Sequence, residues 1–289
     1  MKKVFCFFTL LAVLAACGPK SDQSAAIPTA PAKASSADTI AVSTVVRHAA
    51  DSMMTSAVNI AFPVPDKKHA LLVAAVNEWI SEQLGGTYGD SVEGDYAKLL
   101  ADTAAMAEHY FNAIKENNEK QWNELGDGMP KDYLSEIQLF DSVSIEKSAE
   151  GLDWITFLKV NDVFQGGAHG SHLVFGQTFR KSDGRRIGWD IIRQSSEDGL
   201  QELMRKGILE YMRGDNDKLT EEEAMDILDE PAKYYLPMPQ CPPIFTEEGI
   251  LFLYNQYEIG PYALGLPQFV LTWEKVMPYL NVTAKRMIK

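Results

Sequence analysis

The stretch Gly249–Trp273 reads GILFLYNQYEIGPYALGLPQFVLTW and predicts how the C-terminal part of this chain folds. Its ends, Ile250–Tyr254 and Gln268–Trp273, are apolar runs of a length typical of buried β-strands. The loop between them holds two prolines, two glycines and two tyrosines, so it is rigid and aromatic. Such a loop is either a packed corner or a ligand-facing surface. We favour the packed corner, because aromatic residues at rigid turns bury their rings.

Strand-like and helix-like sequence comes in blocks over the rest of the chain. Residues 40–62 alternate in the β manner, and apolar residues then recur at helical spacing over 72–84 and 96–114. Further strands are predicted at Ile137–Lys147, Leu152–Val160, Leu173–Lys181 and Arg186–Ile192. Helices follow, one capped by Ser195 and one opened by the capping box of Thr220 and Glu223. Because helices and strands do not alternate regularly, the predicted class is α+β.

The N-terminus has the pattern of an export signal. Lys2 and Lys3 precede an apolar run from Val4 to Ala16, which is too short to span a bilayer comfortably. The run ends in Leu14-Ala15-Ala16-Cys17-Gly18, which resembles a bacterial lipobox and implies a lipid on Cys17. Residues 17–39 are rich in Ala, Ser and Pro, so we expect a flexible, disordered tether.

These observations give a complete predicted layout. After the tether we expect two small lobes, each with helices packed on a mainly antiparallel sheet. The predicted segments are a signal peptide (1–16), the lipidated Cys17 with its tether (17–39), a first lobe (40–130), a second lobe (131–280) and a tail (281–289).

The charge of the chain limits its partners. Its formal net charge is −13, and removal of Lys2 and Lys3 with the leader lowers it to −15. An acidic body argues against nucleic acid, which needs a positive surface. It permits a basic partner, although high negative charge also serves solubility. The mature chain keeps only Cys17 and Cys241, so acylation of Cys17 leaves no pair for an internal disulfide, and Cys241 is interpreted as a packed or free thiol.

The motif that most strongly indicates a functional site is Gly166-Gly167-Ala168-His169-Gly170-Ser171-His172. Histidines three apart share a face on a helix, but the glycines disfavour a helix, and in a strand His169 and His172 would point to opposite faces. We therefore expect no metal here, and favour a histidine held by backbone hydrogen bonds at the entrance of a strand. If His169 contacts a ligand instead, the tyrosine-rich loop supplies the other candidates, which are Tyr257, Glu258 and Tyr262.

The signatures of the common enzyme classes are missing. The chain has no GxSxG elbow, no HExxH and no phosphate-binding GK[ST]. The Asp215-Asn216-Asp217 run lacks the glycine and the final glutamate of a calcium loop. No residue is assigned a catalytic role and no cofactor is expected.

Two groups of motifs resemble known families. Gly166-Gly167-Ala168-His169, followed by Tyr257-Glu258-Ile259-Gly260-Pro261-Tyr262-Ala263-Leu264-Gly265, resembles the DUF3298 domain. Val58-Asn59-Ile60-Ala61-Phe62-Pro63, with a helix carrying Val76-Asn77 soon after, resembles the DUF4163 domain. Together they cover about residues 40–280.

The resemblance implies an extracytoplasmic protein. Relatives include the extracellular part of an anti-sigma factor that recognises lysozyme and the non-catalytic part of a peptidoglycan deacetylase. The resemblance carries over no catalytic residue. We therefore expect a lipid-anchored binding module of the bacterial envelope, facing the periplasm or the cell surface, with a basic protein such as lysozyme or a wall glycan as partner. The alternatives are a wall-polysaccharide hydrolase or deacetylase-type enzyme that uses His169, and a passive assembly lipoprotein.

Overall fold

The computed structural model describes residues 38–130, 134, 136–194, 197–214 and 218–288. They form two sheets with helices, which confirms the α+β class. The larger sheet has five strands in the order β1-β2-β3-β4-β5, and the smaller has three in the order β6-β7-β8. The predicted signal peptide, Cys17 and residues 18–37 of the tether lie outside the described residues.

The larger sheet begins with a hairpin of β1 (Val42–Ala50) and β2 (Met54–Pro63). Asp51 closes the turn, since its side-chain Oδ1 accepts hydrogen bonds from the backbone N–H groups of Met53 and Met54 at 2.7 and 2.9 Å. The predicted β segment over 40–62 is therefore a hairpin of two strands.

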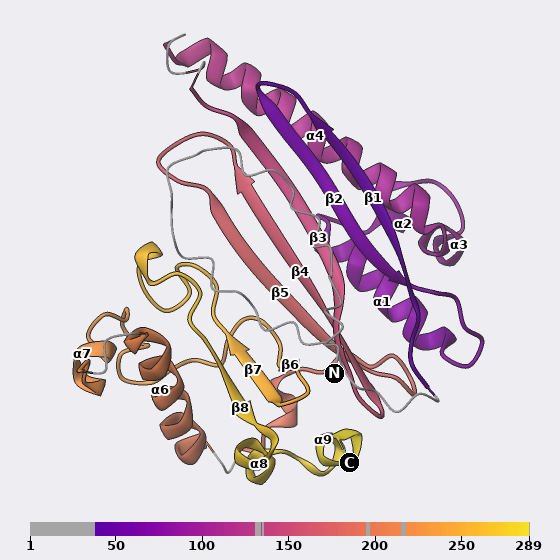
Figure 1. The fold of residues 1–289 in the computed structure, drawn as a ribbon. Helices are drawn as coiled ribbons and strands as arrows, with labels where there is room; N and C mark the ends of the chain where they lie inside the picture. The colour runs from indigo at the N-terminus through magenta and orange to yellow at the C-terminus, as the bar shows by residue number, and fades with distance from the viewer. Residues whose placement is uncertain (1–37, 131–133, 135, 195–196, 215–217, 289) are drawn as a thin grey trace, which may run out of the picture.

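Strand β2 pairs in parallel with β3, and the helices that cover the sheet lie in the chain segment between these two strands. Parallel neighbours need a long crossover, here built from several helices. The crossover consists of α1 (Ala70–Gln83), α2 (Tyr88–Ser91), α3 (Tyr96–Ala101) and α4 (Thr103–Gly128). Figure 1 shows α1 and α4 packed along one face of the five-stranded sheet. The buried stripe of α4 includes Met106, Ala107, Tyr110 and Phe111, as the helical spacing predicts.

The single helix predicted over 96–114 is in fact two helices. Asp102 is the N-cap of α4, and its carboxylate accepts a hydrogen bond from Ala105 N at 3.1 Å. A capping aspartate satisfies a backbone N–H that a helix start leaves unpaired, so the chain can turn between α3 and α4. The apolar stripe continues across the break, which is why spacing alone does not reveal it.

The remaining strands of the larger sheet are antiparallel neighbours. They are β3 (Leu139–Glu150), β4 (Trp154–Phe164) and β5 (Ser171–Arg180). The predicted strand Arg186–Ile192 is wrong, because only its two ends form isolated bridges, Arg186 with Phe179 and Ile192 with Leu280. Between them, Trp189–Ile191 is a short 3-10 helix, η1. Ile187 and Ile191 are both buried, so their alternation reflects core packing and not sheet pairing.

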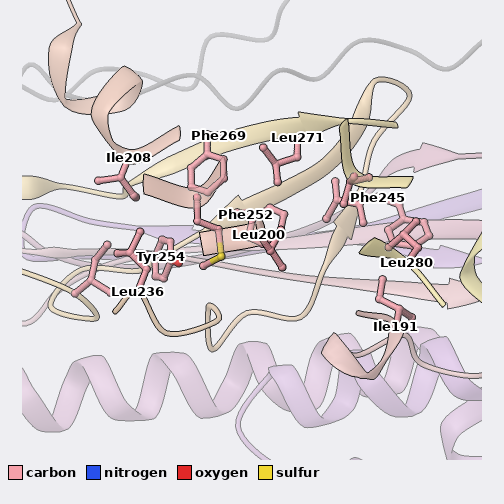
Figure 2. Close-up of a cluster of buried hydrophobic side chains, with 14 of the residues drawn as sticks. Ile191, Leu200, Ile208, Leu236, Phe245, Phe252, Tyr254, Phe269, Leu271 and Leu280 are labelled. Carbon is pink, nitrogen blue, oxygen red and sulfur yellow. The ribbon is translucent and has the colours of Figure 1, made fainter. Parts of the chain in front are cut away.

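The smaller sheet contains the stretch that opened the sequence analysis. It consists of β6 (Ile244–Phe245), β7 (Gly249–Leu253) and β8 (Gln268–Thr272). Around it lie α6 (Glu197–Arg213), α7 (Glu221–Met225), α8 (Trp273–Val276) and α9 (Val282–Ile288), with the 3-10 helices η3 (Tyr262–Leu264) and η4 (Met277–Tyr279). Leu200 and Ile208 of α6 pack with Phe252 and Phe269 of the sheet in the buried cluster that Figure 2 draws.

Three sequence predictions concern this part of the chain. The capping box of Thr220 and Glu223 is confirmed, and the helix that it opens, α7, ends at Met225. The predicted helix cap Ser195 lies outside the described residues. Residues 281–289, expected to be a tail, hold α9, whose Ala284 and Met287 are buried in the C-terminal core. Because these two apolar residues are three positions apart, they lie on one face of the short helix, and this face packs against the core.

The two sheets are joined by polar contacts at the β5 side of the larger sheet. The hydroxyls of Thr156 and Thr178 lie 2.9 Å apart, and both bond to the segment that contains β6. The Cys241 thiol sulfur accepts a hydrogen bond from Gly176 N at 3.1 Å, and burial raises the pKa of the thiol to about 12. The larger sheet takes strands from both predicted lobes, since β2 precedes residue 130 and its neighbour β3 follows it.

Candidate functional site

The loop between β4 and β5 places His169 on the surface. Gly166 and Gly167 have φ values of +89° and +100°, a region that residues with a side chain rarely adopt, so this tight turn requires glycine. His169 follows, two residues before β5, and its ring Nδ1 lies 3.0 Å from Gly170 O. The histidine therefore sits at a strand entrance with a backbone contact, as the sequence indicates.

Two tyrosines from the β7–β8 loop meet this histidine. The Tyr262 ring stacks on the His169 ring with centroids 3.8 Å apart and planes 23° apart, and its hydroxyl donates to Gly170 O at 3.0 Å. The Tyr257 hydroxyl lies 3.3 Å from His169 Nε2. We call His169, Tyr257 and Tyr262 the aromatic cluster. It joins loops that the sequence analysis singled out separately.

Tyr257 has an unusual backbone and an exposed ring. Its φ is +64°, and it is the one described residue other than glycine with a positive φ. The left-handed region costs an L-residue roughly 1–2 kcal/mol, least for asparagine and aspartate. The side chain is nevertheless 62% exposed, so burial of the ring does not offset this cost. The expectation of a packed corner is wrong for Tyr257, whereas the half-buried Tyr262 fits it in part.

The Glu258 side chain binds backbone N–H groups and does not face a ligand site. Its two carboxylate oxygens accept hydrogen bonds from Gln240 N at 2.6 Å and from Asn255 N at 2.8 Å. Burial raises the pKa of this carboxyl, and the two backbone donors oppose that rise. Glu258 therefore fixes the shape of the loop, while the rings of the aromatic cluster form its outer surface.

A second pair of groups, which the sequence motifs do not predict, lies next to the aromatic cluster. His172 Nδ1 is 2.5 Å from Asp162 Oδ1, and this hydrogen bond raises the pKa of His172 against the opposing effect of burial. Gln256, the neighbour of Tyr257, accepts a hydrogen bond from His172 N at 3.2 Å. Asp162 and His172 are directly opposite each other in the β4–β5 ladder. A correct prediction of the pairing register of this hairpin would therefore have predicted the pair.

Asn255 anchors the tyrosine-bearing loop to the edge of β5. Its amide accepts from Val174 N and donates to Val174 O, both at 2.9 Å. The side chain thus pairs with β5 much as another strand would. The relative position of His169 and the two tyrosines depends on this anchor, because Asn255 lies just two residues before Tyr257.

Two exposed acidic residues of α4 lie near the contact with Gly166. The Leu125 side chain at the end of α4 packs beside Gly166, where an added Cβ would come within 3.0 Å of it. Glu124 and Asp127, on either side of Leu125, are exposed. Lys120 lies 3.8 Å from Glu124 and His172 pairs with Asp162, so cationic partners balance part of this charge.

The chemistry available at the site is stacking and hydrogen bonding. Within the described ranges no three His, Cys, Asp or Glu side chains are grouped so that they could hold a metal ion. Cys241 is buried with its pKa raised, which makes it a poor nucleophile. His169 contacts aromatic groups and a backbone carbonyl, whereas its neighbour His172 is paired with a carboxylate.

Comparison with known proteins identifies one domain of the chain. Residues 190–274 match the sequence model of DUF3298, which is described as a protein of unknown function. The chain therefore carries a DUF3298 domain over these residues. The matched range includes Tyr257, Glu258 and Tyr262 but not His169. No curated protein matches the chain.

Two solved structures share the fold. One is the crystal structure of a DUF3298 family member from Bacteroides fragilis NCTC 9343, with a TM-score of 0.61 and 17% identity, covering 86% of this chain and 97% of that one. The other, a DUF3298 family protein from Pseudomonas aeruginosa PAO1, has a TM-score of 0.50 and 8% identity, with coverages of 85% and 96%. At these identities the likeness shows the fold alone.

Two further findings concern the membrane. Cys17, the predicted lipidation site, lies outside the described residues. Over the part of the chain that the structure describes, none of the helices is both long and apolar enough to cross a bilayer.

Proposed function

We propose that this chain is a lipid-anchored binding module of the bacterial cell envelope, and that the aromatic cluster contacts its ligand. The observation that carries the proposal is Tyr257, whose strained backbone holds a 62% exposed ring beside His169 and Tyr262. Strained backbone conformations are concentrated at functional sites, where the surrounding structure holds a group in the conformation needed for binding. Exposed tyrosines are also typical of binding hot spots.

The proposed ligand is a basic protein of the lysozyme type. The chain has a formal net charge of −13, and the exposed Glu124 and Asp127 lie next to Leu125, which packs beside Gly166 of the His169 loop. Complementary charge speeds encounter with a basic partner and helps to exclude acidic ones. A wall glycan is the competing ligand, since an aromatic platform can also stack on an uncharged surface.

The envelope location is proposed from the sequence. It is supported by the lipobox that ends at Cys17, by the tether that follows, and by the resemblance to DUF4163 and to the lysozyme-recognising anti-sigma factor. A chain with a lipid at Cys17 would be anchored to a membrane and would carry its folded body outside the cytoplasm. Incorporation of radiolabelled palmitate, lost in Cys17→Ser, tests this part. Recovery of the unlabelled protein in the cytosol would contradict it.

The binding test uses the chain from residue 18 and calorimetry with a basic lysozyme and, separately, with solubilised wall fragments. We expect lysozyme to bind, and Tyr257→Ala to weaken its binding about tenfold or more, as loss of a hot-spot residue does. Tyr234→Ala is the matched control, because Tyr234 is equally exposed, at 68%, but lies outside the cluster. Raising the salt concentration should weaken lysozyme binding.

The outcomes separate the candidates. Binding of wall fragments alone, lost in Tyr257→Ala and insensitive to salt, would make the ligand a glycan. Equal losses of affinity in Tyr257→Ala and Tyr234→Ala would show that the aromatic cluster is not part of the binding interface. If neither ligand binds at high concentration, the binding module itself is refuted.

The second candidate function is a wall-polysaccharide hydrolase that uses His169. What favours it is the imidazole–carboxylate pair of His172 and Asp162 close to His169, because such a pair orients a histidine for proton transfer. Turnover assays on peptidoglycan with the wild type, His169→Ala and His172→Ala test this candidate. Turnover that disappears in folded His169→Ala would support it, and absence of turnover in the wild type would exclude it for that substrate.

A further inference from the structure

The hydrogen bonds inside the aromatic cluster have a fixed direction. A carbonyl oxygen can only accept, so the Tyr262 hydroxyl donates to Gly170 O at 3.0 Å. For the same reason His169 Nδ1, which is also 3.0 Å from Gly170 O, carries the ring proton. These two donors occupy both lone pairs of the carbonyl oxygen. In the neutral His169 ring the proton is therefore on Nδ1, and Nε2 is an acceptor.

This tautomer decides the direction of the contact with Tyr257. Because Nε2 has no proton, the Tyr257 hydroxyl donates to it across 3.3 Å. Tyr257 and Tyr262 thus both direct their single hydroxyl proton toward the protein, and each oxygen keeps only lone pairs for other partners. The two hydroxyls accept hydrogen bonds from a ligand but have no proton left to donate to it.

The rings of the cluster are open to a cation. The Tyr257 side chain is 62% exposed, and the centroids of the Tyr257 and Tyr262 rings are 5.7 Å apart, close enough for both rings to contact one ligand group. The face of an aromatic ring carries partial negative charge and attracts cations within about 6 Å of its centre. The lysines that lie over rings elsewhere in the described ranges use Phe111, Phe175 and Tyr234, so the cluster has no lysine of its own.

The next residue along the chain, Glu258, places a carboxylate without a counter-ion close to the cluster. Its oxygens accept from Gln240 N and Asn255 N, and it has no cationic partner among the residues that the structure describes. Two neutral backbone donors leave the net charge of the carboxylate in place, and a partly buried charge is screened less than an exposed one. This charge favours a cation at the cluster over a neutral sugar.

We propose that the aromatic cluster recognises a guanidinium group, the side chain of one arginine on the surface of the bound protein. A guanidinium is planar, so it stacks on an exposed ring, and it has only donors, which match hydroxyls that only accept. A lysine ammonium also has only donors, but it is strongly hydrated and has no flat face. This inference rests on the proposed function, because it names the group through which a basic protein binds.

The first test is the tautomer of His169. In the chain from residue 18, ¹⁵N NMR at pH 8, where the imidazole is neutral, should show a proton on Nδ1 and none on Nε2. A proton on Nε2 would overturn the proposal, because the Tyr257 hydroxyl would then accept from the histidine and present its own proton to the ligand.

The second test compares three small probes, the N-acetyl methylamides of arginine, citrulline and lysine. Citrulline has the planar shape of arginine without its charge, and lysine has the charge without the plane. Shifts of the Tyr257 and Tyr262 ring signals measure binding. We expect the arginine probe to bind about fivefold more tightly than the citrulline probe, which corresponds to about 1 kcal/mol of cation–π attraction, and more tightly than the lysine probe. Equal affinity for arginine and either other probe would overturn the proposal.

Variants separate the ring from the hydroxyl. Tyr257→Phe keeps the ring and removes the acceptor, so it should weaken arginine binding in part, whereas Tyr257→Ala should abolish it. His169→Phe keeps an aromatic ring beside Tyr262 but frees the Tyr257 proton, so the preference for arginine over citrulline should shrink. Tyr234→Phe, at an exposed tyrosine outside the cluster, is the matched control and should bind as the wild type does. Arginine binding that survives in Tyr257→Ala would overturn the proposal. If His169→Phe does not fold, the Tyr257 variants and the probe ratio still decide.

Failure of this inference differs from failure of the proposed function. Lysozyme binding that needs Tyr257, together with equal affinity for the arginine and citrulline probes, would refute the guanidinium and leave the binding module standing. Selective binding of the arginine probe, without binding of lysozyme or wall fragments, would support the guanidinium site and refute the proposed partner.

Discussion

At the scale of a single residue, Tyr257 has a conformation that is unfavourable for folding but suitable for binding. Its φ of +64° is unfavourable for a tyrosine, and its ring is mostly exposed. If the ring stabilised the fold, an asparagine there would be harmful, whereas if the ring is held out for a ligand, asparagine should be tolerated. Asparagine adopts this backbone region more readily than tyrosine.

Tyr257→Asn should leave the free energy of unfolding unchanged or raise it by up to about 1 kcal/mol, because it relieves left-handed backbone strain. The same variant should weaken ligand binding, because it removes the exposed ring. Urea unfolding gives the first quantity and calorimetry the second. A loss of stability above about 1 kcal/mol would instead mean that the ring serves packing.

The second residue-scale prediction concerns His172. Its hydrogen bond to Asp162 raises the pKa of the imidazole in the folded protein. A raised folded pKa means that the pair stabilises the fold fully below the ordinary imidazole pKa of about 6.5, and that this contribution disappears as pH rises through the higher folded pKa. The difference in unfolding free energy between wild type and Asp162→Asn should therefore be larger near pH 6 than near pH 9.

An NMR titration of His172 checks the cause directly. In Asp162→Asn its pKa should fall, since the hydrogen bond to the carboxylate is the largest contribution to the shift and burial acts in the opposite direction. Asp90→Asn, a change at an exposed aspartate of α2, is the matched control and should not move it. An unchanged titration in Asp162→Asn would show that the pair does not form.

At the scale of secondary-structure elements, the site depends on the way a loop is attached to a strand edge. The Asn255 side chain makes both hydrogen bonds that Val174 offers at the outer edge of β5. An exposed edge is a liability for a sheet, and this contact covers part of it. It also holds the loop with Tyr257 and Tyr262 against the loop with His169.

Asn255→Ala leaves the buried N–H and C=O of Val174 without partners. Each unsatisfied buried group costs about 1–3 kcal/mol, so for two groups we expect a loss of about 2–6 kcal/mol in the free energy of unfolding. Asn112→Ala, at an exposed position of α4, should change it by less than about 0.5 kcal/mol. Chemical denaturation measures both, and similar small losses would show that water replaces Asn255 at this edge.

For the whole molecule, a buried group of charges ties the start of the described chain to the larger sheet. Glu150, with a side chain only 2% exposed, pairs with Lys181 at 2.8 Å and with Lys147 at 3.1 Å. It also accepts from Ile40 N at 2.9 Å, while Lys147 donates to Ile40 O at 2.8 Å. Segments more than 100 residues apart in sequence are thus held together by one carboxylate.

Glu150→Gln should lower the free energy of unfolding by about 3–5 kcal/mol, because it removes the buried carboxylate that pairs with the buried Lys181. Glu146→Gln is the control on the same strand, at an exposed position, and should have little effect. The double variant Glu150→Gln with Lys181→Met should lose less than the sum of the two single losses. Additive losses in denaturation experiments would contradict the coupling of these charges.

Local sequence patterns predicted much of the fold but failed where a break or a contact depended on distant residues. The apolar ends of the 249–273 stretch became β7 and β8, and the Thr220 capping box formed. The 96–114 stripe hid the helix break at Asp102, because burial continues on both sides of it. The alternation over 186–192 was misinterpreted as a strand, since core packing produced the same spacing.

The sequence by itself determined the α+β class, most strands, and the candidate residues His169, Tyr257 and Tyr262, because each of these depends on periodicity or turn chemistry within a short segment. The tertiary structure alone decided the parallel pairing of β2 with β3, the pair of His172 and Asp162, and the hydrogen bond that directs the Tyr262 hydroxyl proton to Gly170 O. It also decided that Tyr257 meets His169 from 88 positions away. Such contacts depend on how whole elements pack, and no local pattern encodes that packing.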